Sequence, residues 1–122
     1  SMNEQCWALI GGYDEEYKLW RVHLRRQISG RPGSVEADWE WALDQEEEFG
    51  NLSGFAHTHS VGAGIDPSAR DIRTMQAWCS ALGKPLLCLI AEGEELAEPV
   101  AYVFENDQSD GSATKAFEIL DS

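Results

Sequence analysis

A chain of 122 residues, 43% of them hydrophobic and five of them tryptophan, is long enough for one domain with a real core. Its 22 acidic and 9 basic residues give a formal net charge of −13, which argues against a nucleic-acid partner and suits either plain solubility or a basic partner. No apolar run approaches the roughly 20 residues that a bilayer-spanning helix needs, and the first residues lack a signal-peptide pattern, so we expect no membrane partner.

The first part of the chain predicts two strands. The apolar run Cys6–Ile10 is typical of a buried strand, and Gly11-Gly12 is expected to end it in a turn. From Lys18 to Arg25 the pattern alternates, which predicts a half-solvated strand; Trp20, Val22 and Leu24 share one face, and Arg21, His23 and Arg25 share the other.

After a loop at Gly30–Gly33, Ser34 is expected to cap a helix that runs to about Phe49, with Val35, Trp39, Ala42 and Leu43 on one face. Glu46, Glu47 and Glu48 lie at its C-terminal end, where the helix dipole disfavours negative charge. Two interpretations stay open for these glutamates: a solvated face, or a contact for a basic partner.

The second half predicts a strand at Leu52–Thr58, a glycine-containing loop at Ser60–Pro67 and a helix from Ser68 to about Leu82. The inner side of that helix is expected to carry Ile72, Met75, Trp78, Cys79 and Leu82. A central strand at Pro85–Ile90 and two further strands at Pro99–Phe104 and Ala116–Leu120, with a polar loop at Asn106–Ser112 between the last two, complete the pattern. The prediction is one α/β domain over residues 1–122, with a mixed, curved sheet flanked by helices at about 35–49 and 68–82.

The three cysteines, Cys6, Cys79 and Cys88, are odd in number, widely spaced and set in apolar context. This pattern predicts buried free thiols in a reducing compartment, and hence a cytoplasmic protein. None belongs to a CxxC pair, so nothing indicates a zinc site made of thiolates.

The pattern with the most chemical content is His57-Thr58-His59 followed by Asp71. Side chains alternate along a strand, so the two histidines share one face, and Asp71 falls in the first turn of the next predicted helix. Two imidazoles and a carboxylate, with a fourth position left to water, describe a catalytic zinc site and therefore a hydrolase. Ser68 and Asp71 alone also fit a helix capping box, but no capping rule requires the two histidines.

His57-Thr58-His59, followed by Pro67-Ser68-x-x-Asp71, resembles the JAMM motif of the JAB1/MPN/Mov34 metalloprotease family. Glu4, with Gly11 seven positions later, matches the glutamate that this family places in an early strand. The resemblance extends from Glu4 to about Phe104 and implies a JAB1/MPN-like, cytidine-deaminase-like fold. It is strongest to the compact prokaryotic-type members, because long insertions like those of the eukaryotic deubiquitinating relatives are missing.

The resemblance also implies roles for individual residues. His57, His59 and Asp71 would hold Zn²⁺, and Glu4 would act as the general base on a zinc-bound water. Ser68 would help to stabilise the oxyanion of the tetrahedral intermediate. The implied substrate is a ubiquitin-like protein or its conjugate, cleaved at the isopeptide or peptide bond after the C-terminal tail.

The chain departs from the family pattern in three places. Eight residues separate His59 from Ser68, one more than is usual, and Ser60 stands where a proline commonly follows the second histidine. Only three residues precede Glu4, where the family usually has a helix. Either the natural protein is trimmed here, or a partner or a second copy, as in a homodimer, covers that face of the sheet.

Two other functions are compatible with the same residues. One is an MPN-type scaffold or interaction module without catalytic activity, although such modules normally lack one or more of the ligands. The other is a zinc hydrolase that acts on a small amide or on a peptide unrelated to ubiquitin.

Overall fold

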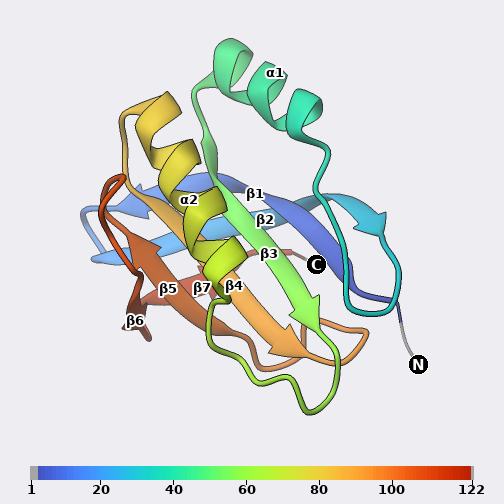
Figure 1. Cartoon of the computed structure of the whole chain (residues 1–122). Helices are drawn as coiled ribbons and strands as arrows, with labels where there is room; N and C mark the ends of the chain where they lie inside the picture. Colours follow the sequence, from blue (N-terminus) through green and yellow to red (C-terminus); the bar gives the residue numbers. More distant parts are fainter. Residues whose placement is uncertain (1–2, 122) are drawn as a thin grey trace.

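The computed structural model describes residues 3–121, which form a seven-stranded mixed sheet and two helices (Figure 1). The strands are β1 (Gln5–Asp14), β2 (Leu19–Ser29), β3 (Leu52–His59), β4 (Leu86–Glu92), β5 (Val100–Phe104), β6 (Ser112–Thr114) and β7 (Phe117–Ile119); the helices are α1 (Trp39–Phe49) and α2 (Ala69–Leu82). The strand order is β6-β5-β4-β3-β1-β2-β7, in which β3–β4 and β2–β7 are the parallel pairs. The prediction of an α/β domain with a mixed sheet is confirmed.

The sheet has a core on each face, and both helices lie on the same face. Along β4, Leu86, Cys88 and Ile90 pack with Ala42 of α1 and with Met75 and Cys79 of α2. The residues between them, Leu87 and Leu89, pack on the other face with Leu9, Val22 and Ala101. Since Val22 of β2 and Ala101 of β5 share this second core although three strands separate them in the order, the sheet must curl strongly on itself.

The first hairpin differs from the prediction at its turn. β1 continues through Gly11 and Gly12 to Asp14, because Gly11 pairs with Val22 of β2 and its lack of a side chain leaves room for the β2 backbone. The turn comes after β1 instead, where the Asp14 carboxylate accepts hydrogen bonds from the backbone N–H groups of Glu16 and Tyr17 at 2.9 and 3.1 Å. The predicted alternation in β2 is confirmed at Trp20 and Val22, which are buried.

The first helix is shorter than predicted, and Ser34 does not cap it. Ser34 pairs with Arg31 across the loop, and the helix begins at Trp39 after the N-cap Asp38, whose side chain accepts a hydrogen bond from Trp41 N–H at 3.0 Å. The prediction that Leu43 shares one face of the helix with Ala42 is wrong, since Ala42 is buried and Leu43 is 42% exposed. Asp38 lies in the middle of the predicted helix and starts the observed one, because its carboxylate accepts from one of the first free N–H groups of α1.

The three glutamates at the end of α1 do not behave alike. Glu47 and Glu48 are exposed, as a solvated face would be. The Glu46 carboxylate instead accepts hydrogen bonds from Lys84 Nζ at 2.8 Å and from Leu52 N–H at 3.1 Å. Glu46 therefore fastens the end of α1 to the start of β3.

The remaining elements follow the prediction closely. α2 begins after Ser68 and ends at Gly83, and β3, β4, β5 and β7 lie within the predicted segments to within about two residues. The short strand β6 was not predicted, because Ser-Ala-Thr carries no apolar alternation and pairs only through its backbone with β5.

All three cysteines are buried free thiols, as predicted. Within residues 3–121, no helix has the length and apolar character needed to cross a membrane.

Gly54 lies in a close backbone contact between β3 and its parallel neighbour β4. Its φ of +144° is one that residues with a side chain rarely adopt, and a Cβ there would overlap the carbonyl group of Leu87 in β4.

We therefore expect Gly54→Ala to lower the free energy of unfolding by about 3 kcal/mol or more, measured by chemical denaturation. The matched control is Gly12→Ala in β1, where a Cβ meets no atom within 4 Å. Equal stability of the two variants would contradict this account of the β3–β4 contact.

Candidate metal centre

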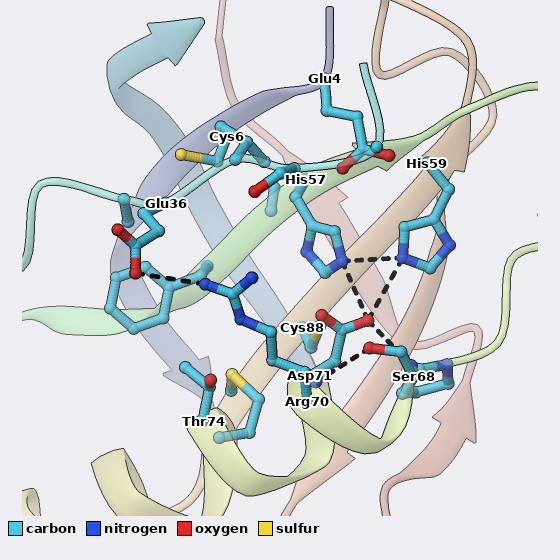
Figure 2. Close-up of a pocket in the computed structure, with 18 of the residues that line it drawn as sticks. Glu4, Cys6, Glu36, His57, His59, Ser68, Arg70, Asp71, Thr74 and Cys88 are labelled. Atoms are coloured by element: carbon cyan, nitrogen blue, oxygen red, sulfur yellow. Dashed lines mark hydrogen bonds and ion pairs between the residues drawn. The ribbon is translucent and has the colours of Figure 1, made fainter. Parts of the chain in front are cut away.

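The pairing of three elements brings the predicted site residues together at one end of the sheet. Phe55, His57 and His59 alternate along β3, and Phe55 packs in the core beneath α2, so the two histidines face the start of that helix. Asp71 lies in the first turn of α2. Figure 2 shows the two imidazole rings and the Asp71 carboxylate converging on one point.

The three polar atoms form a nearly equilateral triangle. The Nε2 atoms of His57 and His59 lie 3.1 Å apart, and Asp71 Oδ2 is 3.1 Å from the first and 3.2 Å from the second. Two ligands at about 2.0–2.1 Å from a tetrahedral ion lie about 3.3–3.4 Å apart, so the triangle has nearly the size of one face of such a tetrahedron. The side chains are 15%, 13% and 18% exposed, which leaves the group shielded but reachable. These residues could hold a metal ion.

The carboxylate of Asp71 also completes the N-terminus of α2. The backbone N–H of Ser68 donates to Asp71 Oδ2 at 2.9 Å, and the N–H of Asp71 donates to Ser68 Oγ at 3.0 Å, which is a capping box. Burial opposes ionisation of Asp71, but hydrogen bonds from His57 and His59 outweigh it and hold its pKa well below the usual range. The capping interpretation and the ligand interpretation therefore both apply to this residue.

His59 is oriented by a backbone group behind it. Its Nδ1–H donates to the carbonyl oxygen of Gly64 at 2.9 Å, which leaves Nε2 directed at the candidate metal position. The hydrogen bond to Asp71, opposed by burial and aided by Gly64, raises the pKa of His59 above its ordinary value. This arrangement, a ligand nitrogen in front and a carbonyl partner behind, is the usual one for histidines that bind metals.

Glu4 reaches the site from the start of β1. The antiparallel register pairs Cys6 with His57, so the chain before Cys6 runs past the end of β3 that carries His59. The Glu4 carboxylate lines the same groove as the histidines (Figure 2). It contacts Ser60, whose N–H and Oγ lie 3.3 and 3.4 Å from Glu4 Oε2. Ser60 has both a backbone N–H and a hydroxyl to donate, and this contact orients the Glu4 carboxylate.

The hydroxyl of Ser68 has one role in the helix cap and retains capacity for another. Its oxygen accepts from Asp71 N–H, while the hydroxyl proton is left to donate to a group in the groove. All five predicted site residues, Glu4, His57, His59, Ser68 and Asp71, therefore line one groove.

That groove has a volume of about 980 Å³ and runs between α2 and the segment before α1. Trp39, Phe55 and Trp78, whose rings pack together with centroids 5.0 to 5.7 Å apart, form its apolar floor. An ion pair between Glu36 and Arg70 spans its two sides, with the Glu36 oxygen 3.2 Å from the guanidinium (Figure 2). Besides the histidines, the charged residues that line it are one arginine and four acidic residues, Glu4, Glu36, Asp66 and Asp71.

Two thiols also line the groove, Cys6 and Cys88. Burial raises the pKa of Cys6 to about 11 and that of Cys88 further, so without a metal ion both are neutral thiols near neutral pH. The group whose ligand atoms lie together consists of His57, His59 and Asp71.

Sequence patterns did not indicate the residues that surround the ligands. The Glu36–Arg70 ion pair and the contacts made by Glu92 and Tyr102 to the loop at 60–67 join segments far apart in the chain, and the Gly64 carbonyl reaches His59 through the path of that loop. No local motif marks such contacts; strand register and loop conformation create them. Neither a family model nor a curated protein matches this chain in sequence.

We expect the purified protein to bind about one metal ion per chain and the variant His57→Ala/His59→Ala to bind none, because two of the three ligand atoms are lost. Elemental analysis after dialysis against added metal measures this directly. His23→Ala is the matched control, since His23 is on the outer side of β2 and its Nδ1 contacts Asp121 at 3.1 Å. Equal metal content in the double variant and the control would exclude this centre.

The pH dependence of the chelator-treated protein should reflect His59. Because Asp71 raises its pKa, the protonated imidazole contributes stability that is fully present below about pH 6.5 and is lost as the pH rises through the raised value. The free energy of unfolding should therefore fall over that window, and metal affinity should rise over it as the proton leaves. Asp71→Asn should flatten the stability profile; an unchanged profile would show that Asp71 is not the cause.

Proposed function

We propose that this protein is a zinc-dependent isopeptidase or peptidase of the JAB1/MPN/Mov34 type, acting after the C-terminal tail of a ubiquitin or ubiquitin-like protein. The observation that carries the proposal is the convergence of all five motif residues on one groove, although they come from three separate segments of the chain. A motif that arose by chance would have no reason to assemble in this way.

Zinc is the ion that this ligand set favours. Two neutral imidazole nitrogens and one carboxylate oxygen, with a fourth position open to the groove, are typical of catalytic zinc sites. The carbonyl partner of His59 fixes the tautomer that such a ligand needs. The same residues argue against a scaffold module without catalytic activity, because such a module does not require an intact ligand set beside a carboxylate and a hydroxyl.

The chemistry follows from where each side chain lies. His57, His59 and Asp71 would hold zinc, which would lower the pKa of a coordinated water to about 7 and so supply a nucleophile for the scissile carbonyl carbon. Glu4, held by Ser60, would accept a proton from the attacking water at its carboxylate and return it to the leaving amine as the C–N bond breaks. Ser68 donates its free hydroxyl proton to the developing oxyanion. The products are a carboxylate on the tail and a free amine.

The groove favours a polypeptide segment over a small amide. Its volume of about 980 Å³ exceeds what one amide needs, and its apolar floor and polar rim suit an extended chain. The acidic excess among its lining residues, together with the net charge of −13, suits a basic tail. The curled mixed sheet with both helices on one face is compatible with the JAB1/MPN-like, cytidine-deaminase-like fold that we propose with this function.

Glu4→Gln should lower kcat by about 100-fold or more while zinc stays bound, because the amide cannot take the proton but leaves the ligands intact. The assay measures cleavage of a ubiquitin-like protein whose tail is fused to a reporter, beside short unrelated peptides, and zinc is measured on the same samples. Glu48→Gln, on the exposed end of α1, is the matched control for the loss of a charge.

Retained activity in Glu4→Gln would assign the base elsewhere. Cleavage of the short peptides but not of the fused tail would favour the hydrolase of an unrelated peptide or amide. Turnover of a basic tail should also fall as salt rises, and activity that is insensitive to salt would argue against charge-guided binding.

A further inference from the structure

We infer that Glu92 is a positioning residue for the metal centre, acting through the loop at 60–67 on the imidazole of His59. The inference rests on the proposed role of His59 as a metal ligand. Glu92 is the last residue of β4 and pairs with His59, the last residue of the parallel strand β3. The two strand ends are therefore side by side where the loop leaves the sheet (Figure 1).

The Glu92 carboxylate holds the loop by two backbone groups. Its Oε2 accepts hydrogen bonds from the N–H of Gly62 at 2.7 Å and from the N–H of Gly64 at 3.1 Å. Hydrogen bonds to a carboxylate are stronger than those between neutral groups. The two glycines have φ values of +91° and +86°. Because glycine has more backbone freedom than other residues, hydrogen bonds such as those to Glu92 are needed to keep the loop in one conformation.

Gly64 transmits this constraint to the histidine. The N–H of Gly64 is held by Glu92, and its carbonyl oxygen accepts from His59 Nδ1–H at 2.9 Å. The N–H of Gly93, next to Glu92, donates to the His59 carbonyl at 2.9 Å, which closes a ring of contacts. A displacement of Gly64 would thus turn the imidazole and move Nε2 away from the other two ligand atoms.

The two ends of the loop are held separately. The loop has eight residues, and the Gly62-Ala63-Gly64 segment is the part that Glu92 fastens. The far end of the loop is held separately, by the Tyr102 hydroxyl, which lies 2.9 Å from the Ile65 carbonyl oxygen and 3.1 Å from Asp66 Oδ1. Of these two anchors, the one made by Glu92 acts on Gly64, whose carbonyl oxygen contacts the His59 imidazole.

The test compares metal affinity in four variants, using competition with a chromophoric chelator for Zn²⁺ and the visible absorption of Co²⁺ as a report on ligand geometry. Glu92→Ala should weaken Zn²⁺ binding about 10- to 100-fold and alter the Co²⁺ spectrum. Glu92→Gln keeps an oxygen acceptor and should stay within about threefold of wild type. Glu94→Ala removes the same charge from an exposed neighbouring site, and Tyr102→Phe loosens only the far end of the loop, so both should bind Zn²⁺ nearly as wild type does.

A second readout needs neither metal nor turnover. In chelator-treated protein, Glu92→Ala should speed hydrogen exchange at the amides of Gly62 and Gly64 about tenfold, and Glu94→Ala should not. Equal affinities and spectra for Glu92→Ala and Glu94→Ala, or equal exchange at the two glycines, would overturn the inference. A dependence of metal binding on Glu92 in a protein that cleaves no ubiquitin-like tail would retain the inference and reject the proposed substrate. If wild type bound neither Zn²⁺ nor Co²⁺, the inference would be overturned together with the proposed ligand set.

Discussion

The carboxylate of Asp71 is the interaction on which the rest of the site depends. One oxygen atom accepts from the Ser68 N–H that begins α2 and faces both histidine Nε2 atoms of β3. A single group therefore satisfies the free end of a helix, fixes that helix against the sheet and completes a ligand set. The negative charge also lies at the helix terminus where the dipole favours it, so the capping role and the ligand role reinforce each other.

Strand register supplies the other half of the arrangement. The pairing of Cys6 with His57 brings Glu4 to the end of β3 that carries His59, and the pairing of His59 with Glu92 brings a second carboxylate to its other side. A slip of one residue in either pairing would move these side chains to the opposite face. Gly54 permits the close approach of β3 to β4 because it has no side chain. The strand pairing that positions the site residues therefore depends on a glycine at this position.

Two contacts outside the candidate ligand set hold the residues around it. Ser60 donates to Glu4, and Glu92 fastens the loop at 60–67 through Gly62 and Gly64. The first contact acts on a carboxylate that lines the groove, and the second acts on the loop whose Gly64 carbonyl contacts His59. Since neither contact is between sequence neighbours, neither could be predicted from the pattern.

The sequence by itself determined most elements and the identity of the candidate ligands. Apolar periodicity located β3, β4 and α2, and the Ser68–Asp71 spacing located the start of α2, because these signals depend only on neighbouring residues. It misplaced the start of α1, where Asp38 caps in preference to Ser34, since several residues could cap and packing selects one. Only the tertiary structure decided that both helices share one face, that Glu46 pairs with Lys84, and that Glu92 and Gly64 support His59. Those contacts depend on the curl of the sheet and on the path of a loop, which long-range packing sets and local sequence does not encode.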